Sequence, residues 1–217
     1  MESFVEEYDI SMAKKFIKAI KNHKFECFYK LIMTYTLSRN ELLNLQWDDI
    51  DFENNTITVY AISLDKESGK YKYQRKREKH EELGRTFPLL PCIRKLLIKE
   101  REKTTHSSNY VCIRPNGLII NANTLSRNVR MIAKRNKLPE TLISGIKKSC
   151  HSFFLKNSPN YEFFRCWTRF DIEMRKENLY SDFDICTQKR FLNIINNFID
   201  TGNMDLRTKT NDSEMWG

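Results

Sequence analysis

Glu41-Leu42-Leu43-Asn44-Leu45-Gln46-Trp47-Asp48-Asp49-Ile50-Asp51-Phe52 is the stretch that decides the fold, because a helix signal runs directly into a strand signal. A short helix capped by Ser38 or Asn40 packs Leu42 and Leu45 inward, and Trp47 closes its end as a core residue. The acidic residues that follow belong to the turn into a sheet. The stretch therefore predicts a helix that leads into a small β-structure.

The next residues predict a strand and a basic hairpin. Asn54-Asn55 is turn material, and Thr56–Tyr60 alternates β-branched residues in the manner of a half-buried strand. The region Lys66–Arg85 is strongly basic, and Tyr71 and Tyr73 alternate in it as they would on a solvent-facing strand. Its cations include Lys70, Lys72, Arg75, Lys76, Arg77 and Lys79.

Apolar residues at helical spacing dominate the rest of the chain. Residues 11–35 predict two helices broken near Asn22–Lys24, with lysines on the outward face. Pro88 and Pro91 mark a boundary. Beyond it we expect the helix Cys92–Glu102, the short strand Tyr110–Ile113, a helix from a cap at Asn123 or Thr124 to Arg135, the helix Thr141–Asn157, a short aromatic helix over 160–170, and the helix Gln188–Asp200.

Length and composition favour one α+β, mostly helical domain. The chain has 217 residues, of which 40% are hydrophobic, and no repeat or long linker divides it. We expect residues 1–200 to form the domain and residues 201–217 to be a polar, disordered tail. No apolar run is long enough for a membrane span or a signal peptide, so we expect a cytoplasmic protein, or a nuclear or viral-factory protein in a eukaryotic host or virus.

The composition also excludes several kinds of site. The six cysteines stand singly and the four histidines are scattered, so we expect buried thiols and no metal. No glycine-rich phosphate loop occurs, so we expect no nucleotide and no small-molecule cofactor. The formal net charge is +9, which favours a polyanionic partner because cations near phosphates release condensed counterions.

Three segments carry a family resemblance. The stretch Glu41–Phe52 resembles the tyrosine recombinase pattern E-L-x-x-L-x-W-x-D-I-D, and Arg85–Leu89 resembles R-x-V-P-L after that family's hairpin. The weaker third segment, Ser144–His151, falls where H-D-L-R-H-T-F-A would stand. In this order, they make roughly residues 10 to 185 similar to the catalytic domain of the tyrosine recombinase, or phage integrase, family.

The resemblance implies a fold and a chemistry. In that family a tyrosine attacks a DNA phosphodiester and forms a 3′-phosphotyrosyl intermediate. Two arginines and a histidine hold the phosphate, and a hairpin lysine protonates the leaving 5′ oxygen. Forked guanidinium groups suit this task because charge develops on the nonbridging oxygens, and covalent attack needs no metal or energy-rich cofactor.

This chain departs from the family at the residues that hold the phosphate. The first arginine corresponds to Ser38, with Arg39 displaced by one residue. The preceding Thr-Gly is Tyr35-Thr36, so we expect an altered turn. The histidine and arginine of H-x-x-R correspond to Ser144 and Lys147, and lysine lacks the two-pronged geometry. In an alternative register His151 is the histidine and Cys150 stands at the arginine; otherwise His151 is a helix-packing residue.

Further matches complete the implied catalytic set. The later Gly-His position falls near Arg169-Phe170, and Lys79 is the hairpin lysine, with Lys76 and Arg77 as competitors. Tyr180 corresponds to the nucleophile. Tyr161 is the less favoured candidate because it occupies a helix-packing position.

Three functions remain open at this point. The first is a DNA-binding protein of this family, acting in site-specific recombination or integration, whose strand cleavage is weakened or lost. The second is an active recombinase that uses Tyr180, Lys147, Lys79 and Arg39. The third is an unrelated basic RNA-binding module. Loss of two arginines and both histidines favours the first, because each 1.36 kcal/mol of lost transition-state stabilisation is about a tenfold loss in rate.

The resemblance also implies partners. We expect double-stranded DNA to contact Lys72, Arg75, Lys76, Arg77, Lys79, Arg127, Arg130 and Lys148. We expect no N-terminal core-binding domain of the kind that the family has, and hence a modest, salt-dependent affinity for DNA. Active relatives assemble by exchanging C-terminal segments, and the amphipathic Gln188–Asp200 is a candidate for such self-assembly on DNA.

Overall fold

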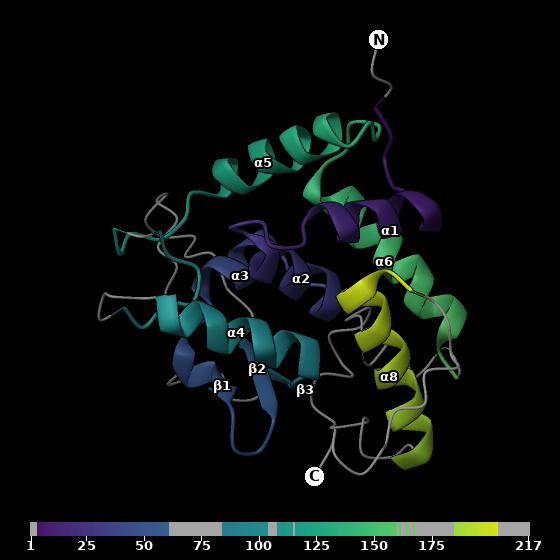
Figure 1. The fold of residues 1–217 in the computed structure, drawn as a ribbon. Helices are drawn as coiled ribbons and strands as arrows, with labels where there is room; N and C mark the ends of the chain where they lie inside the picture. Colours follow the sequence, from purple (N-terminus) through teal and green to yellow (C-terminus); the bar gives the residue numbers. More distant parts are fainter. Residues whose placement is uncertain are drawn as a thin grey trace, which may run out of the picture.

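The computed structural model describes residues 4–60, 84–103, 108–114, 116–159, 161, 164, 167 and 185–203. They form a mostly helical domain with a small antiparallel sheet on one side, as predicted (Figure 1). The helices are α1 (Ile10–Ala19), α2 (Glu26–Tyr35), α3 (Arg39–Asn44), α4 (Pro91–Lys103), α5 (Ala122–Arg135), α6 (Ile143–Asn157) and α8 (Ile185–Thr201). The sheet contains β1 (Ile50–Asp51), β2 (Thr56–Tyr60) and β3 (Gly84–Pro88), and the 3-10 turn η1 (Trp47–Asp49) precedes β1.

Helix α2 is the centre of the domain. Every residue of α2 is buried, and α3, α4, α6 and α8 pack against it. The predicted break between α1 and α2 is confirmed. The prediction that lysines of both helices face outward is right for α1 but wrong for Lys30 of α2, which is 2% exposed. Lys30 tolerates burial because its Nζ lies 2.9 Å from Oε1 of Glu26 and donates to the carbonyl oxygen of Asp200 at 3.3 Å.

The strand predicted at 56–60 is β2, the middle strand of the order β1-β2-β3. It pairs antiparallel with β3, so that Ile57 faces Phe87 and Val59 faces Arg85. Ile57, Val59 and Phe87 are buried, whereas the hydroxyls of Thr58 and Thr86 meet on the outer face at 3.0 Å. This alternation is the period-two pattern on which the prediction depended. Residues 61–83 connect the two paired strands.

The helix in the deciding stretch begins as a capping box. The amide of Glu41 donates to Oγ of Ser38 at 3.2 Å, and the amide of Ser38 donates to Oε2 of Glu41 at 2.8 Å. Ser38 is therefore the cap, rather than Asn40. Leu42 and Leu45 are buried as predicted. Trp47 is only half-buried, and the guanidinium of Arg101 lies 5.6 Å from its ring centre.

Large aromatic side chains fill the core between the sheet and the C-terminal half. The ring centres of Tyr35 and Phe87 lie 5.3 Å apart, and Trp167 lies within 6 Å of both. Nε1 of Trp167 donates to the carbonyl oxygen of Thr34 at 2.8 Å. Trp167 comes from the predicted aromatic segment 160–170, so that segment contributes to the core.

Several predicted boundaries differ from those observed. Tyr110–Ile113 makes only isolated bridges, Gln46 with Tyr110 and Ile113 with Ile119. Helix α5 is capped by Asn121, whose side chain accepts from the amide of Asn123 at 2.8 Å, so the caps predicted at Asn123 or Thr124 are wrong. Helix α8 starts at Ile185, before the predicted Gln188, and ends at Thr201.

The N-terminal segment is bound along the start of α6, which the sequence did not indicate. The amide of Val5 donates to the carbonyl oxygen of Glu140 at 2.9 Å, and Oγ1 of Thr141 donates to the carbonyl oxygen of Val5 at 2.9 Å. The amide of Tyr8 donates to Oγ of Ser149 at 2.8 Å. We call residues 5–8 the N-terminal strap. Because the side chain of Thr141 binds this strap, α6 begins at Ile143 rather than at the predicted residue 141.

None of the helices in the described part of the chain combines the length and the apolar character needed to cross a lipid bilayer.

Candidate nucleic-acid interface

The predicted site residues fall into two groups. Tyr180 and the hairpin cations Lys72, Arg75, Lys76, Arg77 and Lys79 lie outside the described residues, so their roles remain predictions. The described group comes from three helices: Arg39 from α3, Arg127 and Arg130 from α5, and Lys147 and Lys148 from α6.

Arg39 is the first residue of α3, and its side chain is exposed. The turn before it has Thr36 where the family has a glycine. Thr36 takes the left-handed conformation, with φ 52° and ψ 34°, that glycine adopts most readily. The capping box then fixes the orientation of Ser38 and hence the start of α3. Ser38, which aligns with the first arginine of the family pattern, is thus held at the start of α3 by the cap.

A buried ion pair lies directly beneath this position. Nη2 of Arg85 in β3 lies 3.4 Å from Oε1 of Glu41, whose other oxygen binds the amide of Ser38. The same guanidinium lies 4.9 Å from the ring centre of Phe87. Two of the matched segments therefore meet in space, and one carboxylate connects the sheet to the start of α3. The sequence showed both residues as motif members but did not show that they are partners.

Helix α6 presents the third matched segment. Ser144 and Lys148 are exposed and Lys147 is half-buried. His151, one turn after Lys147, packs edge-on against Phe164 at 4.5 Å between ring centres. Burial, followed by the charge of Lys147, holds the pKa of His151 below its ordinary value, so the imidazole is neutral at pH 7. His151 is therefore a packing residue, as predicted.

The alternative register of this segment disagrees with the structure. It places Cys150 at the arginine position, but Cys150 is fully buried on the inward face of α6, and burial raises the pKa of its thiol. A residue that faces the core cannot contact a DNA phosphate. The register that aligns Ser144 and Lys147 with H-x-x-R is the one that places both positions on the accessible side of the helix.

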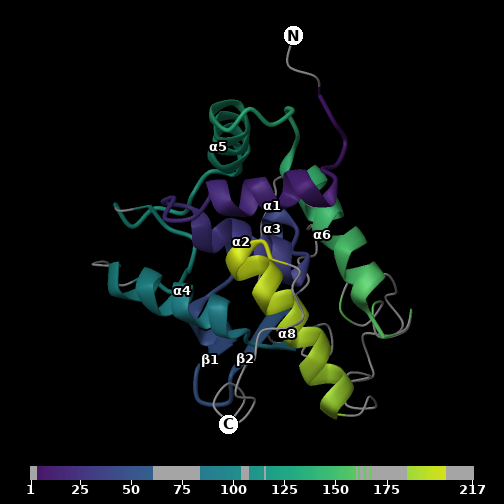
Figure 2. The ribbon, with the colours of Figure 1, turned by 45° about the vertical axis from the view of Figure 1, so that its right-hand side comes forward.

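Helix α5 lies above α1 at the edge of the domain in both Figure 1 and Figure 2. Leu125 and Val129 face inward, and Arg127 and Arg130 are exposed, as predicted. Nε of Arg130 lies 2.9 Å from Oε1 of Glu140, so part of its charge is compensated. Within the described residues Arg127 has no acidic partner, which makes it the more available of the two for a phosphate.

The described tyrosines differ sharply in accessibility. Tyr8, Tyr29 and Tyr35 are buried, and burial raises the pKa of each phenol, that of Tyr8 to about 12. Their hydroxyls donate to backbone carbonyls, so these tyrosines are structural. Tyr161 is 57% exposed, which contradicts the expectation that it occupies a helix-packing position. Packing therefore gives no reason to exclude Tyr161 as a nucleophile.

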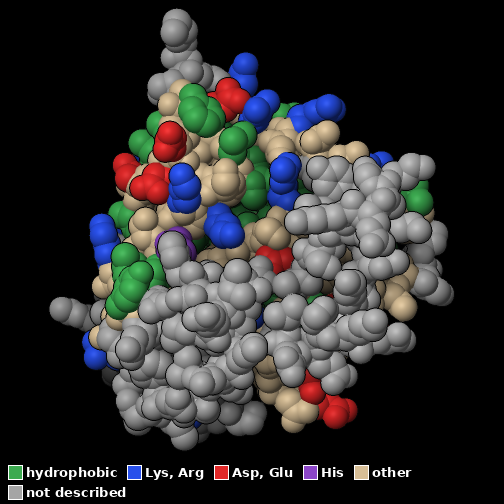
Figure 3. All heavy atoms as spheres, turned by 180° about the vertical axis from the view of Figure 1, so that it is seen from behind, with side chains coloured by type: hydrophobic (Ala, Val, Ile, Leu, Met, Phe, Trp, Pro, Cys, Tyr) green, Lys and Arg blue, Asp and Glu red, His purple; other side chains and the backbone are tan. Residues whose placement is uncertain are grey.

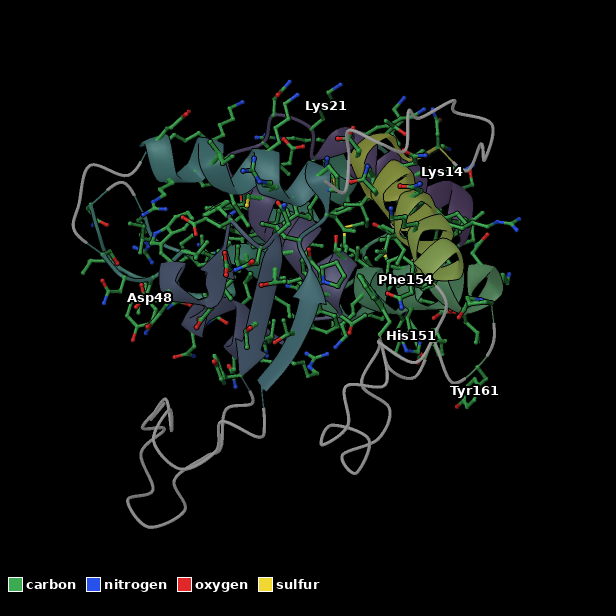
Figure 4. All side chains as sticks on the ribbon, turned by 90° about the horizontal axis from the view of Figure 1, so that it is seen from below. Lys14, Lys21, Asp48, His151, Phe154 and Tyr161 are labelled. Carbon is green, nitrogen blue, oxygen red and sulfur yellow. The ribbon has the colours of Figure 1, made fainter. Side chains whose placement is uncertain are left out.

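The candidate elements share one side of the domain. In Figure 4 the ends of β2 and β3 that border residues 61–83 lie along the same lower edge as His151 and Tyr161. Figure 3 looks onto this side and shows lysine and arginine side chains over its upper half, with a group of acidic side chains at one margin. The described ends of β2 and β3 and the helix α6 thus border the same side of the domain.

Among the residues that the structure describes, no group of three or more His, Cys, Asp or Glu side chains could hold a metal ion. Cys27, Cys92, Cys112 and Cys150 are free, buried thiols, as predicted.

A helical domain with this sheet, and with a capped helix bound to its third strand by an ion pair, has the fold of the tyrosine recombinase catalytic domain. The chain belongs to the phage integrase family, whose sequence model matches residues 9–152. This membership contradicts the alternative in which the chain is an RNA-binding module unrelated to recombinases.

Known relatives agree with this assignment. The tyrosine recombinase XerC-like protein of Caldanaerobacter subterraneus subsp. tengcongensis is 27% identical over 166 residues, which cover 68% of this chain and 42% of that protein. The chain thus spans less than half the length of this curated relative.

Solved structures show the same fold at low identity. XerA recombinase superposes with a TM-score of 0.56 at 16% identity, covering 88% of this chain and 65% of that one. The Tn1549 transposon integrase in complex with a circular intermediate DNA gives a TM-score of 0.60 at 19% identity, covering 81% and 61%. XerH bound to its palindromic difH substrate gives 0.54 at 15%, covering 83% and 50%.

Proposed function

We propose that this chain binds double-stranded DNA and acts in site-specific recombination or integration, with strand cleavage weakened or lost. The observation that carries the proposal is the structural role of the Ser38 side chain. Its hydroxyl accepts the amide of Glu41 as a helix cap, so the position that aligns with the family's first arginine holds a neutral residue with a structural role.

The second phosphate-binding position supports the same conclusion. Lys147 keeps a positive charge on α6 but offers a point charge in place of a bidentate fork. Ser144 offers a hydroxyl where the family has an imidazole. Removing one preorganised donor from such a site costs about 3 kcal/mol of transition-state stabilisation, or roughly two orders of magnitude in rate. Several such losses together leave DNA binding less affected than cleavage, because binding depends mainly on net charge.

An active recombinase is the second candidate, and the exposure of Arg39 beside Ser38 favours it. In this reaction the phenol oxygen of Tyr180 bonds to the phosphorus and its proton passes to solvent. The bond from phosphorus to the 5′ oxygen breaks, and Lys79 supplies the proton that this oxygen takes up. Arg39 and Lys147 hold the nonbridging oxygens. The exposed Tyr161 is the competing nucleophile.

A suicide-substrate assay separates the two candidates. A duplex nicked near the cleavage site is incubated with the protein, and the covalent protein–DNA complex is sought on a denaturing gel. No covalent band with normal DNA binding supports the lost-cleavage function. A band that disappears in Tyr180→Phe and persists in Tyr161→Phe supports the active one. No binding of labelled duplex at low salt contradicts both.

The proposed partner is double-stranded DNA, and we further propose self-assembly on it through α8. Within the chain α8 packs on α1, α2, α4 and α6, and Oδ1 of Asn196 accepts the amide of Cys92 at 2.9 Å. A neighbouring copy could receive the same contacts if α8 were exchanged. Light scattering with and without duplex tests this, and complexes that contain a single protein copy per duplex would contradict it.

A further inference from the structure

The side of the domain opposite His151 carries a second basic surface, which we call the lysine face. In Figure 4 Lys14 and Lys21 lie along the upper edge, whereas His151 and Tyr161 lie along the lower edge. Helix α4 runs along the same upper edge in Figure 4. We use the name lysine face for the exposed or half-exposed lysines of α1, of the turn after it and of α4: Lys14, Lys15, Lys18, Lys21, Lys24, Lys95 and Lys99.

Ion pairs with the described residues do not neutralise these lysines. In the described part of the chain, none of the seven lysines has an acidic oxygen within 4.0 Å, although Lys30, Arg85, Lys103 and Arg130 do. Lys14 and Lys18 are one helical turn apart, and like charges at that spacing destabilise a helix. Stability alone therefore does not favour this arrangement.

The orientation of the lysines is fixed by packing. Ala13, Phe16 and Ile17 on the opposite side of α1 are at most 1% exposed. Rotating α1 to withdraw its lysines would expose these apolar side chains, so the cations are held outward. The surface is thus present without any conformational change.

The chemistry of the lysine face fits a polyanion better than a protein or a membrane. The large hydrophobic side chains that are exposed in the described residues lie elsewhere: Phe4, Leu118, Ile119, Met131, Leu142, Leu155 and Tyr161. A stable protein interface needs a desolvated apolar or aromatic centre, and a membrane-surface helix needs an outward apolar face. DNA phosphates require only accessible cations.

We propose that the lysine face binds a second segment of duplex DNA, so that one molecule bridges two duplexes. The inference rests on the proposed function, which supplies the first duplex on the side of β2, β3 and α6. Two DNA-binding surfaces on opposite sides would hold two segments together before any exchange of strands.

A capture assay tests the proposal. Protein is loaded at low salt on a duplex fixed to beads, excess protein is washed away, and a fluorescent second duplex is added. The test variant is Lys15→Glu/Lys18→Glu/Lys21→Glu, and the matched control is Lys15→Arg/Lys18→Arg/Lys21→Arg, which keeps the charge at the same exposed positions. Glutamate and arginine are both good helix formers, and all three positions are exposed, so folding should be preserved in both variants. Circular dichroism can verify this.

We expect the Glu variant to capture at least about tenfold less second duplex, the Arg variant to capture as much as the wild type, and both to remain on the fixed duplex. Equal capture by the Glu variant overturns the inference, because a bridge made by two copies joined through α8 would survive these changes. Retention on the fixed duplex without any second capture by the wild type also overturns it and leaves the proposed function standing. No retention on the first duplex overturns both.

A competitor identifies the kind of polyanion. Unlabelled duplex should displace the captured duplex at much lower charge concentration than polyglutamate does. If polyglutamate competes equally well, the lysine face fits an acidic protein and the assignment to DNA is wrong.

Discussion

The guanidinium of Arg85 lies 3.4 Å from the carboxylate of Glu41, and the two side chains are 8% and 3% exposed. The pair joins β3 to α3 across 44 residues of sequence. Because Glu41 also completes the capping box with Ser38, one carboxylate determines both where α3 begins and where it lies against the sheet. Any ligand contact at Ser38 or Arg39 therefore depends on this pair.

Removing the carboxylate should unfold the protein more easily. We expect Glu41→Ala to lower the free energy of unfolding by about 3 to 5 kcal/mol, because it removes the carboxylate that pairs with the buried Arg85 and half of the capping box. Urea denaturation measures the change. Glu102→Ala, an exposed residue of α4, is the matched control and should change stability by less than about 0.5 kcal/mol. A small effect at position 41 would show that the pair contributes little.

Gly145→Ala should disrupt the N-terminal strap. A Cβ at this position would collide with Oγ1 of Thr141 and the carbonyl oxygen of Glu6, neither of which can withdraw easily from the strap. We expect a loss of about 1 to 3 kcal/mol and faster hydrogen exchange at the amides of Val5 and Tyr8. Ser144→Ala, at the exposed neighbouring position, should leave both measurements unchanged. Unchanged exchange in Gly145→Ala would argue against close packing of the strap.

Lys137→Gly should stabilise the protein. Lys137 is exposed and has φ 53°, in the left-handed region that disfavours side chains, just after the end of α5. We expect a gain of about 0.5 to 1 kcal/mol in thermal or urea unfolding. Lys137→Ala removes the same charge without relieving the backbone and should give no gain. If both substitutions changed the free energy of unfolding equally, the loss of the charge rather than the backbone conformation would explain the change.

His151 should make the protein less stable as the pH is lowered. Its folded-state pKa lies below the ordinary value of 6.5, so the unfolded chain binds the proton more readily. The free energy of unfolding should therefore decrease as the pH drops below about 7 and level off below the folded-state pKa. His151→Gln should reduce this slope between pH 7 and 5. His23, whose pKa is also lowered by burial, should account for a remaining slope, which His23→Gln should remove. An unchanged slope in His151→Gln would contradict the assignment.

Restoring the family's guanidinium groups should restore cleavage if their absence is what weakens it. In Ser38→Arg/Lys147→Arg we expect at least about a tenfold higher yield of covalent complex on a nicked duplex. The loss of the Ser38 cap should lower stability by about 1 kcal/mol, so the assay needs a temperature well below the unfolding midpoint. Adding Tyr180→Phe should abolish the gain. A double variant that binds DNA but forms no covalent complex would place the defect elsewhere in the site.

Much of the fold follows from local pattern. The capping box at Ser38, the alternation of Thr56–Tyr60 and the spacing of α8 were predictable because each depends on residues within a few positions. The cap of α5 was placed wrongly because Asn121, Asn123 and Thr124 are all good caps, and the bridge of Ile113 with Ile119 determines where the helix can start.

The site was predictable only in part. Matched motifs indicated Arg39 and Lys147, and helical spacing indicated the exposed face of α5, but neither showed which residues are partners. Nothing in the sequence paired Arg130 with Glu140 or Arg85 with Glu41, because each pair joins separate elements. The exposure of Tyr161 was predicted wrongly because helical spacing shows periodicity but not which neighbours cover a face.

The sequence by itself determined the family, the order of the elements and the basic charge, since these depend on residue type and spacing along the chain. Only the tertiary structure decided that Lys30 is buried against Glu26 and Asp200 and that the N-terminal strap packs closely on Gly145. It also decided that cations lie on two opposite sides of the domain. Those outcomes depend on which distant segments share the core, and burial changes the free energy of a charge or a methyl group far more than local sequence does.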